Sequence, residues 1–152
     1  MQLDDVDRQL LTQLQTDATL STERLAKRVG ISKTAAWNRV QRLTDRGVIL
    51  RQVAIVDAQQ IGLNETFFIA VKTNQHNKKW LVRFNGVIRK HPEIIEAHRL
   101  AGDVDYLLKI QVASTRDFDK LYQQIVDEID LYSVTSSLSM EVMKQGTALQ
   151  LV

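Results

Sequence analysis

The chain has 152 residues, no cysteine and a formal net charge of +2, with 44% hydrophobic and 25% charged residues. This length has room for one domain or two small ones, and the lack of cysteine excludes disulfides, thiol catalysis and cysteine-bound zinc. No apolar run approaches the roughly 18–20 residues that span a bilayer, and the acidic N-terminus is unlike a signal peptide, so we expect a cytoplasmic protein without membrane association.

The first predicted elements are helices. One spans about residues 5–15, and two more lie between residues 20 and 49. Ser21 and Ser32 are suitable N-caps for the last two, because a serine hydroxyl can accept a hydrogen bond from an unpaired N–H of the first turn. Gly30 stands where a helix commonly ends in the left-handed conformation. Two helices joined by such a short turn predict a helix-turn-helix.

Basic side chains are concentrated in the same stretch. Residues 24–51 contain eight Arg and Lys residues and one acid, Asp45, which gives a local net charge of +7. Residues 64–152 contain 11 basic and 11 acidic side chains, so that part is neutral. Positive charge gathered on a helix-turn-helix is the footprint expected for phosphate contact. A solvated basic face is the alternative, but the localisation of the charge favours double-stranded DNA as a partner.

The second helix of the motif is the predicted recognition helix. Ala36, Val40 and Leu43 fall on its core side at about 100° per residue. Side chains near the N-terminus of such a helix reach base edges, where Asn and Gln pair with adenine and Lys with guanine. The predicted base readers are Lys33, Thr34, Trp37, Asn38 and Gln41, and the predicted phosphate contacts are Arg39, Arg42 and Arg46. Trp37 lies between the two faces, and packing against the first helix is its alternative role.

The rest of the chain is predicted to alternate strands and helices. Residues 48–56 are rich in β-branched side chains and predict a strand, and the polar stretch 57–65 is the predicted linker between domains 1–56 and 66–152. In the second domain we expect strands at 66–73, 94–101, 106–112 and 133–143, and helices at 78–91 and from Ser114 or Thr115 to about Ile129. The order β-α-β-β-α-β is ferredoxin-like. The predicted fold is therefore α+β, with a winged-type helix-turn-helix domain before a ferredoxin-like domain.

Short motifs in both halves occur in a recognisable order and spacing. They include Leu25-Ala26-x-Arg28-Val29-Gly30-x-Ser32, Arg39-Val40-x-x-Leu43, Gly102-Asp103-x-Asp105-Tyr106 and Thr135-Ser136-Ser137. Together they resemble the Lrp/AsnC (feast/famine) family of transcriptional regulators. The resemblance implies a sequence-specific DNA-binding regulator whose assembly and DNA binding respond to a small effector, usually an amino acid. It also implies a homodimer that assembles into an octamer or a similar ring. The chain departs from the family at residues 33–35, where many members carry prolines, so the resemblance does not transfer an operator sequence.

The resemblance also places the effector site, which lies between dimers. The implied effector-binding residues are Gly102, Asp103, Val104, Asp105, Tyr106, Thr135, Ser136 and Ser137. Gly102 lets a backbone approach closely, so that N–H groups can hold an α-carboxylate. Asp103 or Asp105 can hold an α-ammonium group. The alternative is a simple turn with solvated acids beside a polar strand face, and the resemblance favours the effector site.

Two other classes of function fit parts of the sequence. An effector-independent, nucleoid-type architectural protein would use the helix-turn-helix alone, and an enzyme with a DNA-binding arm would need a catalytic site. The three histidines have no metal-ligand spacing, and there is neither a Gly-rich phosphate loop before a helix nor a nucleophile elbow. We therefore expect a regulator rather than an enzyme, with no catalytic residues, no metal and no cofactor.

Overall fold

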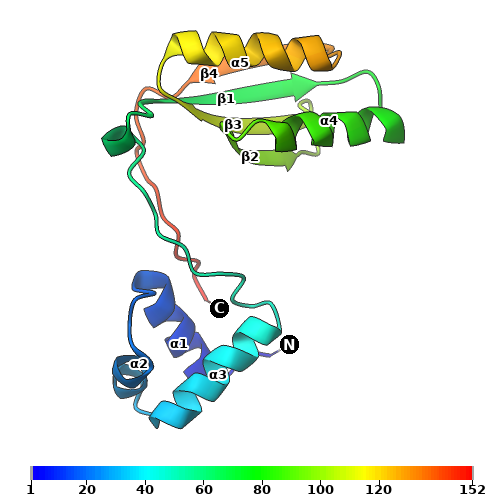
Figure 1. The fold of residues 1–152 in the computed structure, drawn as a ribbon. Coiled ribbons are helices and arrows are strands. Elements are labelled where there is room, and N and C mark those ends of the chain that lie inside the picture. The colour runs from blue at the N-terminus through cyan, green and yellow to red at the C-terminus, as the bar shows by residue number, and fades with distance from the viewer. Residues whose placement is uncertain (1, 152) are drawn as a thin grey trace. The chain divides into compact units, whose positions relative to one another are not determined.

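The computed structural model describes residues 2–151 and has two compact units (Figure 1). The N-terminal unit runs to Ile55 and includes the C-terminal segment from Lys144, whereas the C-terminal unit covers Val56–Met143. Three α-helices and a short 3-10 helix, Gln59–Ile61, precede a β-α-β-β-α-β arrangement. The predicted α+β class and ferredoxin-like order are therefore confirmed. The division into units differs from the predicted one in the place of the C-terminal segment.

The N-terminal unit contains the predicted helix-turn-helix. Its helices are α1 (Asp5–Thr16), α2 (Thr22–Val29) and α3 (Lys33–Asp45). Asp4, Ser21 and Ser32 each accept a hydrogen bond from the backbone N–H three residues later, which caps the three helices. Gly30, with φ 75°, ends α2 in the left-handed conformation and starts the turn to α3. The small core of the unit is formed by Leu10, Leu25, Ala26 and Ala36.

The predicted strand at residues 48–56 is wrong, and the helix-turn-helix therefore has no wing in the described chain. This segment has no regular secondary structure and is not part of the sheet. Leu50, Val53 and Ile55 are exposed along it. β-branched residues fit a pleated surface, but a strand also needs a neighbour to pair with its backbone groups. Local composition predicted the strand and could not show that a pairing partner is missing.

The C-terminal segment of the chain is fixed to α1. The backbone N–H of Leu149 donates to Oε1 of Gln15 at 2.6 Å, and Nε2 of Gln15 donates back to the Leu149 carbonyl at 3.2 Å. Leu151 lies nearby in a hollow that Thr12 and Val29 also line. One side-chain amide thus satisfies both polar groups of a single backbone residue. The two partners are 134 positions apart, so no local pattern predicted this contact.

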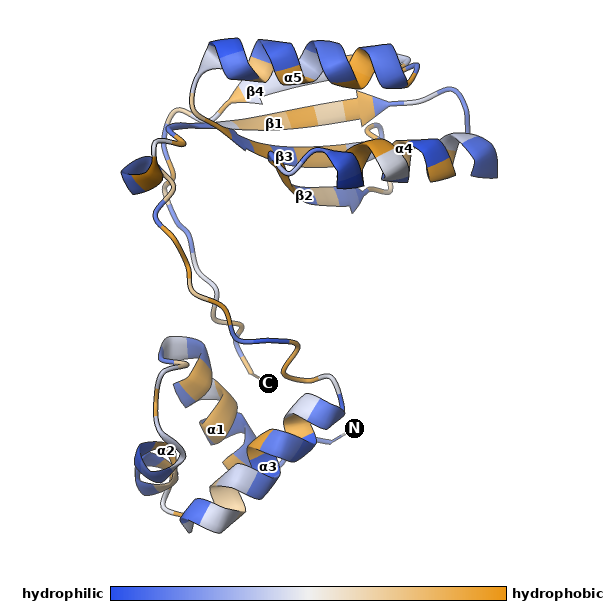
Figure 2. Ribbon diagram, in the orientation of Figure 1, coloured by the Kyte–Doolittle hydropathy of each residue, from blue (hydrophilic) through white to orange (hydrophobic). Residues whose placement is uncertain are grey.

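The C-terminal unit is a four-stranded antiparallel sheet with two helices. Its elements are β1 (Glu65–Lys72), α4 (Lys78–Lys90), β2 (Ile94–Arg99), β3 (Tyr106–Val112), α5 (Thr115–Glu128) and β4 (Ser133–Leu138). The strand order is β2-β3-β1-β4, which puts β1 and β3 in the centre. These two central strands are also the most hydrophobic ones in Figure 2. The last strand ends earlier than the predicted limit at residue 143.

Both helices of this unit pack on the same face of the sheet. Phe67 and Tyr106 point to that face from β1 and β3, because alternate residues of each strand are buried. Phe67 stacks on Phe118 of α5 with ring centroids 3.8 Å apart. Tyr106 lies against Phe84 of α4 with centroids 4.7 Å apart. The other face of the sheet, which carries Phe68, is consequently left without a helix.

Candidate DNA-binding and effector sites

The predicted base readers lie on the exposed surface of α3. Lys33, Thr34, Trp37, Asn38 and Gln41 are all exposed. Trp37 is 56% exposed, so it does not fill the alternative role of a residue packed against the first helix. Thr34, Asn38 and Gln41 are spaced by four and three positions, which aligns them along one side of the helix. Nε2 of Gln41 donates to Oδ1 of Asp45 at 2.9 Å, an exposed contact that a base edge can replace.

Arg39 and Arg42 have a structural role that sequence reasoning missed. Asp7 of α1 is buried and accepts from Nη1 of Arg39 at 2.8 Å. Both oxygens of Asp7 also accept from Nη2 of Arg42, each at 2.8 Å. Oδ2 of Asp4 also accepts a hydrogen bond from Nη1 of Arg39 at 2.6 Å. These contacts join α3 to α1. A guanidinium has five N–H donors, so the phosphate contacts predicted for the two arginines stay predictions.

The ion pair between Asp4 and Arg39 shifts the pKa of both groups. The hydrogen bond from Arg39, with a smaller contribution from the N–H of Asp7, lowers the pKa of Asp4 below its ordinary value. Hydrogen bonds to Asp4 and Asp7 raise the pKa of Arg39, which stays charged. A carboxyl whose pKa is lowered in the folded state stabilises that state above its ordinary pKa. This contribution is lost as the pH falls through the lowered value. Solvent screening keeps the effect of this exposed pair small.

Arg46, the third predicted phosphate contact, stands at the C-cap of α3 and is exposed. None of the ion pairs within residues 2–151 involves it. Of the three predicted phosphate-binding arginines, Arg46 is thus the one whose charge is not shared with a carboxylate of residues 2–151.

The predicted effector loop connects β2 to β3. Gly102 has a φ of 144°, in the range that favours glycine. Asp105 is tied to the end of β1: its N–H donates to the Val71 carbonyl at 3.0 Å, and its Oδ2 accepts from the N–H of Thr73 at 2.8 Å. Asp103 is exposed, whereas Val104 is half-buried. Asp105 is thus part of the fold, and Asp103 is the acid of the loop that faces solvent.

The side chain of Tyr106 does not take part in the surface of this loop. It is 9% exposed and packs in the core beside Phe84. Only its backbone remains near the predicted effector site.

The Thr135–Ser137 stretch starts near the end of the sheet where the loop lies and runs to the middle of the sheet, where Ser137 and Lys109 are both opposite Phe68. β1 separates the two and pairs with both neighbours: Ala70 is opposite Leu107 of β3 on one side and Thr135 of β4 on the other. Thr135, Ser136 and Ser137 are all exposed. Val134 packs against the core on the helix-covered face. Successive side chains of a strand point to opposite faces, so Thr135 and Ser137 are on the face away from the helices.

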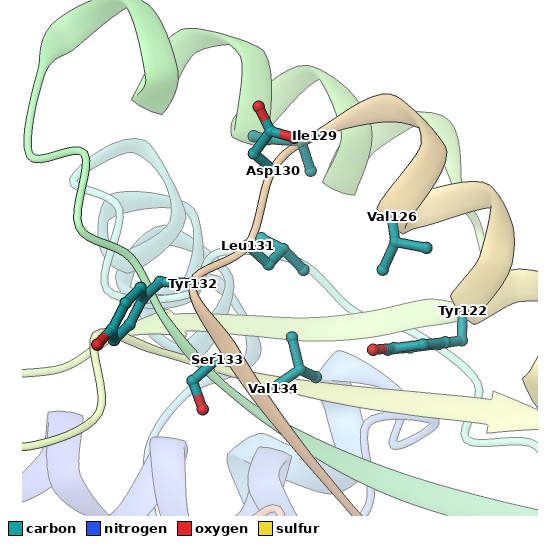
Figure 3. Close-up of a pocket in the computed structure, with 8 residues that line it drawn as sticks. All are labelled: Tyr122, Val126, Ile129, Asp130, Leu131, Tyr132, Ser133 and Val134. Carbon is teal, nitrogen blue, oxygen red and sulfur yellow. The ribbon is translucent and has the colours of Figure 1, made fainter.

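A cavity of about 330 Å³ lies between the end of α5 and the start of β4. Tyr122, Val126, Leu131 and Val134 point into it, whereas Tyr132 points away (Figure 3). The cavity is on the helix-covered side of the sheet. None of the predicted effector residues lines it.

Residues 2–151 contain no helix that is both long and apolar enough to cross a bilayer. Over the same range, no group of three or more His, Asp or Glu side chains is arranged to hold a metal ion.

Known proteins resemble this chain over nearly its whole length. Residues 3–44 match the AsnC-type helix-turn-helix domain, and residues 66–149 match the Lrp/AsnC ligand binding domain. The glutamate uptake regulatory protein of Zymomonas mobilis is 42% identical over 98% of this chain and 91% of its own. The crystal structure of an AsnC family transcriptional regulator from Agrobacterium tumefaciens is 38% identical, with a TM-score of 0.93 and 97% of each chain covered. A transcriptional regulator of Neisseria meningitidis in complex with L-methionine is 25% identical, with a TM-score of 0.93 and coverage of 98% and 97%.

Proposed function

The chain belongs to the Lrp/AsnC family of transcriptional regulators, and from this membership we propose that an amino acid bound to the C-terminal unit changes DNA binding by changing how protomers assemble. The chain is a DNA-binding transcriptional regulator with an amino-acid ligand-binding domain, and not an enzyme. The observation that carries the proposal is the strand register, which puts Thr135 level with Leu107, the residue after the Gly102–Tyr106 loop, with β1 between them.

The proposed effector site is open in a single chain. Gly102, Asp103 and all three residues of the Thr135–Ser137 stretch are exposed. Asp103 is the proposed partner of the α-ammonium group, since Asp105 already accepts from the backbone at the end of β1. Backbone N–H groups of the loop are proposed to hold the α-carboxylate. Assembly of protomers would cover these groups and exclude water from them, so ligand binding and assembly would depend on each other.

We propose that α3 reads DNA sequence through Asn38 and its neighbours. Replacing Asn38 by alanine should lower the preference for the selected DNA sequence over random DNA by about 5–150-fold, which corresponds to ~1–3 kcal/mol for one good bidentate contact. The preferred sequence is first obtained by selection from a random duplex library, and affinities for both duplexes are then measured. Asn74→Ala, which removes an exposed asparagine of the C-terminal unit, is the matched control. Equal losses on both duplexes would show that Asn38 does not read bases.

The bare face of the sheet supports a dimer built through the C-terminal unit. Phe68 is exposed there, with the half-buried Ala70 and Leu107 beside it. Exposed apolar side chains on one face of a sheet favour a second layer that covers them. One recognition helix contacts only a few base pairs, so a second copy also supplies affinity and specificity. We propose a homodimer at minimum, with pairs of dimers in larger rings such as an octamer.

Light scattering should give at least twice the chain mass of 17.4 kDa at micromolar concentration. Phe68→Asp should lower that mass, because it places a charge on the bare face. Val82→Asp puts the same charge on an exposed apolar position of α4 and should leave the mass unchanged. A wild-type monomer would contradict the proposed assembly, as would a wild-type mass for Phe68→Asp.

A further inference from the structure

The exposed side of α4 carries a set of positive charges that the proposed function does not use. Its basic residues are Lys78, Lys79, Arg83, Arg89 and Lys90, all exposed, and the helix contains no acid. Lys90 pairs with Glu128 at 2.8 Å. No ion pair within residues 2–151 involves the other four. The other helix of this unit, α5, has four acids and two bases. The excess of positive charge is therefore confined to α4.

These cations, here called the α4 basic face, share one side of the helix. At about 100° per residue they fall within an arc of about 140°, opposite the buried Trp80, Phe84 and Val87. The helix is about 20 Å long. Gly86 lies within the arc, and nothing is found within 4 Å of the place where its Cβ would be. A large partner can therefore come close to the backbone at the middle of this face.

The start of α4 is positively charged against the preference of the helix dipole. α1, α2 and α5 have an acid in the first turn, whereas α4 has none and begins with Lys78 and Lys79. Cations at this end oppose the dipole, and together with the unpaired N–H groups they create a strongly positive potential that favours an anion. Of the α-helices in residues 2–151, only α3, the predicted recognition helix, also begins with a lysine and lacks an acid in its first turn.

We propose that the α4 basic face is a second DNA-contact surface that binds phosphates without reading sequence. A duplex carries one phosphate charge per about 1.7 Å of its axis, so a face of about 20 Å meets several of them. A protein partner would instead need an apolar centre in the interface. Val82, the one exposed large hydrophobic residue of α4, lies within the arc of the cations, and a single valine is too small to form such a centre. The inference goes beyond the proposed function, because it gives the ligand-binding unit a direct contact with DNA.

The test compares two lengths of DNA. The full-length variant Lys79→Gln/Arg83→Gln removes two charges from the α4 basic face. Filter binding between 50 and 200 mM NaCl measures its affinity for a 15-bp and a 200-bp duplex of random sequence. On the 200-bp duplex the variant should bind more weakly at 50 mM, and its salt slope should be smaller by about 1.8, at about 0.9 per phosphate contact. The factor by which its affinity falls from 50 to 200 mM NaCl should then be about tenfold smaller than the factor for the wild type.

Arg116→Gln/Lys120→Gln removes two charges from α5 and is the matched control, with an expected wild-type slope. Preference of the wild type for a selected 15-bp duplex over random sequence reports on α3, because only α3 is proposed to read sequence, so a failure of the helix-turn-helix to bind DNA is distinguished from a failure of this inference. The inference is overturned if the 200-bp slope of the α4 variant equals that of the wild type, or if the control lowers it equally. If the α4 variant sediments as a smaller assembly but keeps the wild-type salt slope, the α4 basic face contacts an acidic surface of another protomer. That result would also overturn the inference.

Discussion

Replacing Asp7 by alanine is expected to lower the free energy of unfolding of the N-terminal unit by about 2–3 kcal/mol. The side chain of Asp7 is 3% exposed and accepts three hydrogen bonds from the guanidinium groups of Arg39 and Arg42. Removing one partner of a buried ion pair typically costs 3–5 kcal/mol, because the other charge is left buried. Here the two arginines are partly exposed, so water can solvate them and the cost is smaller.

Hydrogen exchange of the amides in α1 and α3 measures this effect for the N-terminal unit alone. Asp5→Ala is the control, since Asp5 is an exposed acid in the same first turn of α1. Asp7→Ala should also weaken binding to all DNA sequences alike, because α3 loses its attachment to α1. Equal protection from hydrogen exchange in Asp7→Ala and Asp5→Ala would mean that the contact of Asp7 with the two arginines does not stabilise the unit. Phosphate binding would then be the one role left for Arg39 and Arg42.

Replacing Gly102 by phenylalanine is expected to abolish the effect of the effector on DNA affinity. Coupling between two sites typically changes affinity by about 5–150-fold, and the variant should reduce this factor to one. A bulky side chain at this position would occupy the approach to the N–H groups of the loop. DNA affinity without effector should stay near that of the wild type, because α3 belongs to the other unit. Paired DNA titrations with and without amino acid measure both quantities.

Gly62→Phe separates loss of the pocket from backbone strain. Gly62 also has a positive φ, 83°, belongs to the same unit, and has open space where a Cβ would be. It lies after the 3-10 helix and not in the effector loop. The control should keep the response to effector. If both variants lose it, strain explains the loss, and if Gly102→Phe keeps it, the effector site lies elsewhere.

The helices and the sheet could be predicted from the sequence because their signals are local. Ser21, Gly30 and Ser32 cap and end helices through contacts within a few residues. The alternation of buried residues on β3 likewise depends only on neighbours along the strand. Residues 48–56 show the limit of such signals, since pairing with another strand decides whether an extended segment joins a sheet.

The sites were harder to predict, because one side chain can serve either the fold or a ligand. Arg39 and Arg42 have the position and charge of phosphate contacts, yet a carboxylate of α1 holds both. Asp105 looks like a ligand group in the loop, yet it accepts from the backbone of Thr73. Asp7 carried one usable signal: an acid on the apolar side of α1, next to the leucines of the core, needs a cationic partner.

The central feature of the proposed function is that an amino acid changes DNA binding. The most direct measurement is the wild-type affinity for its selected duplex with and without each amino acid. We expect at least one amino acid to change the dissociation constant by about 5–150-fold. Saturating DNA should then change the affinity for that amino acid by the same factor, because such coupling is reciprocal. DNA affinity that no amino acid alters would contradict the proposed regulation by an effector and would favour an effector-independent architectural protein.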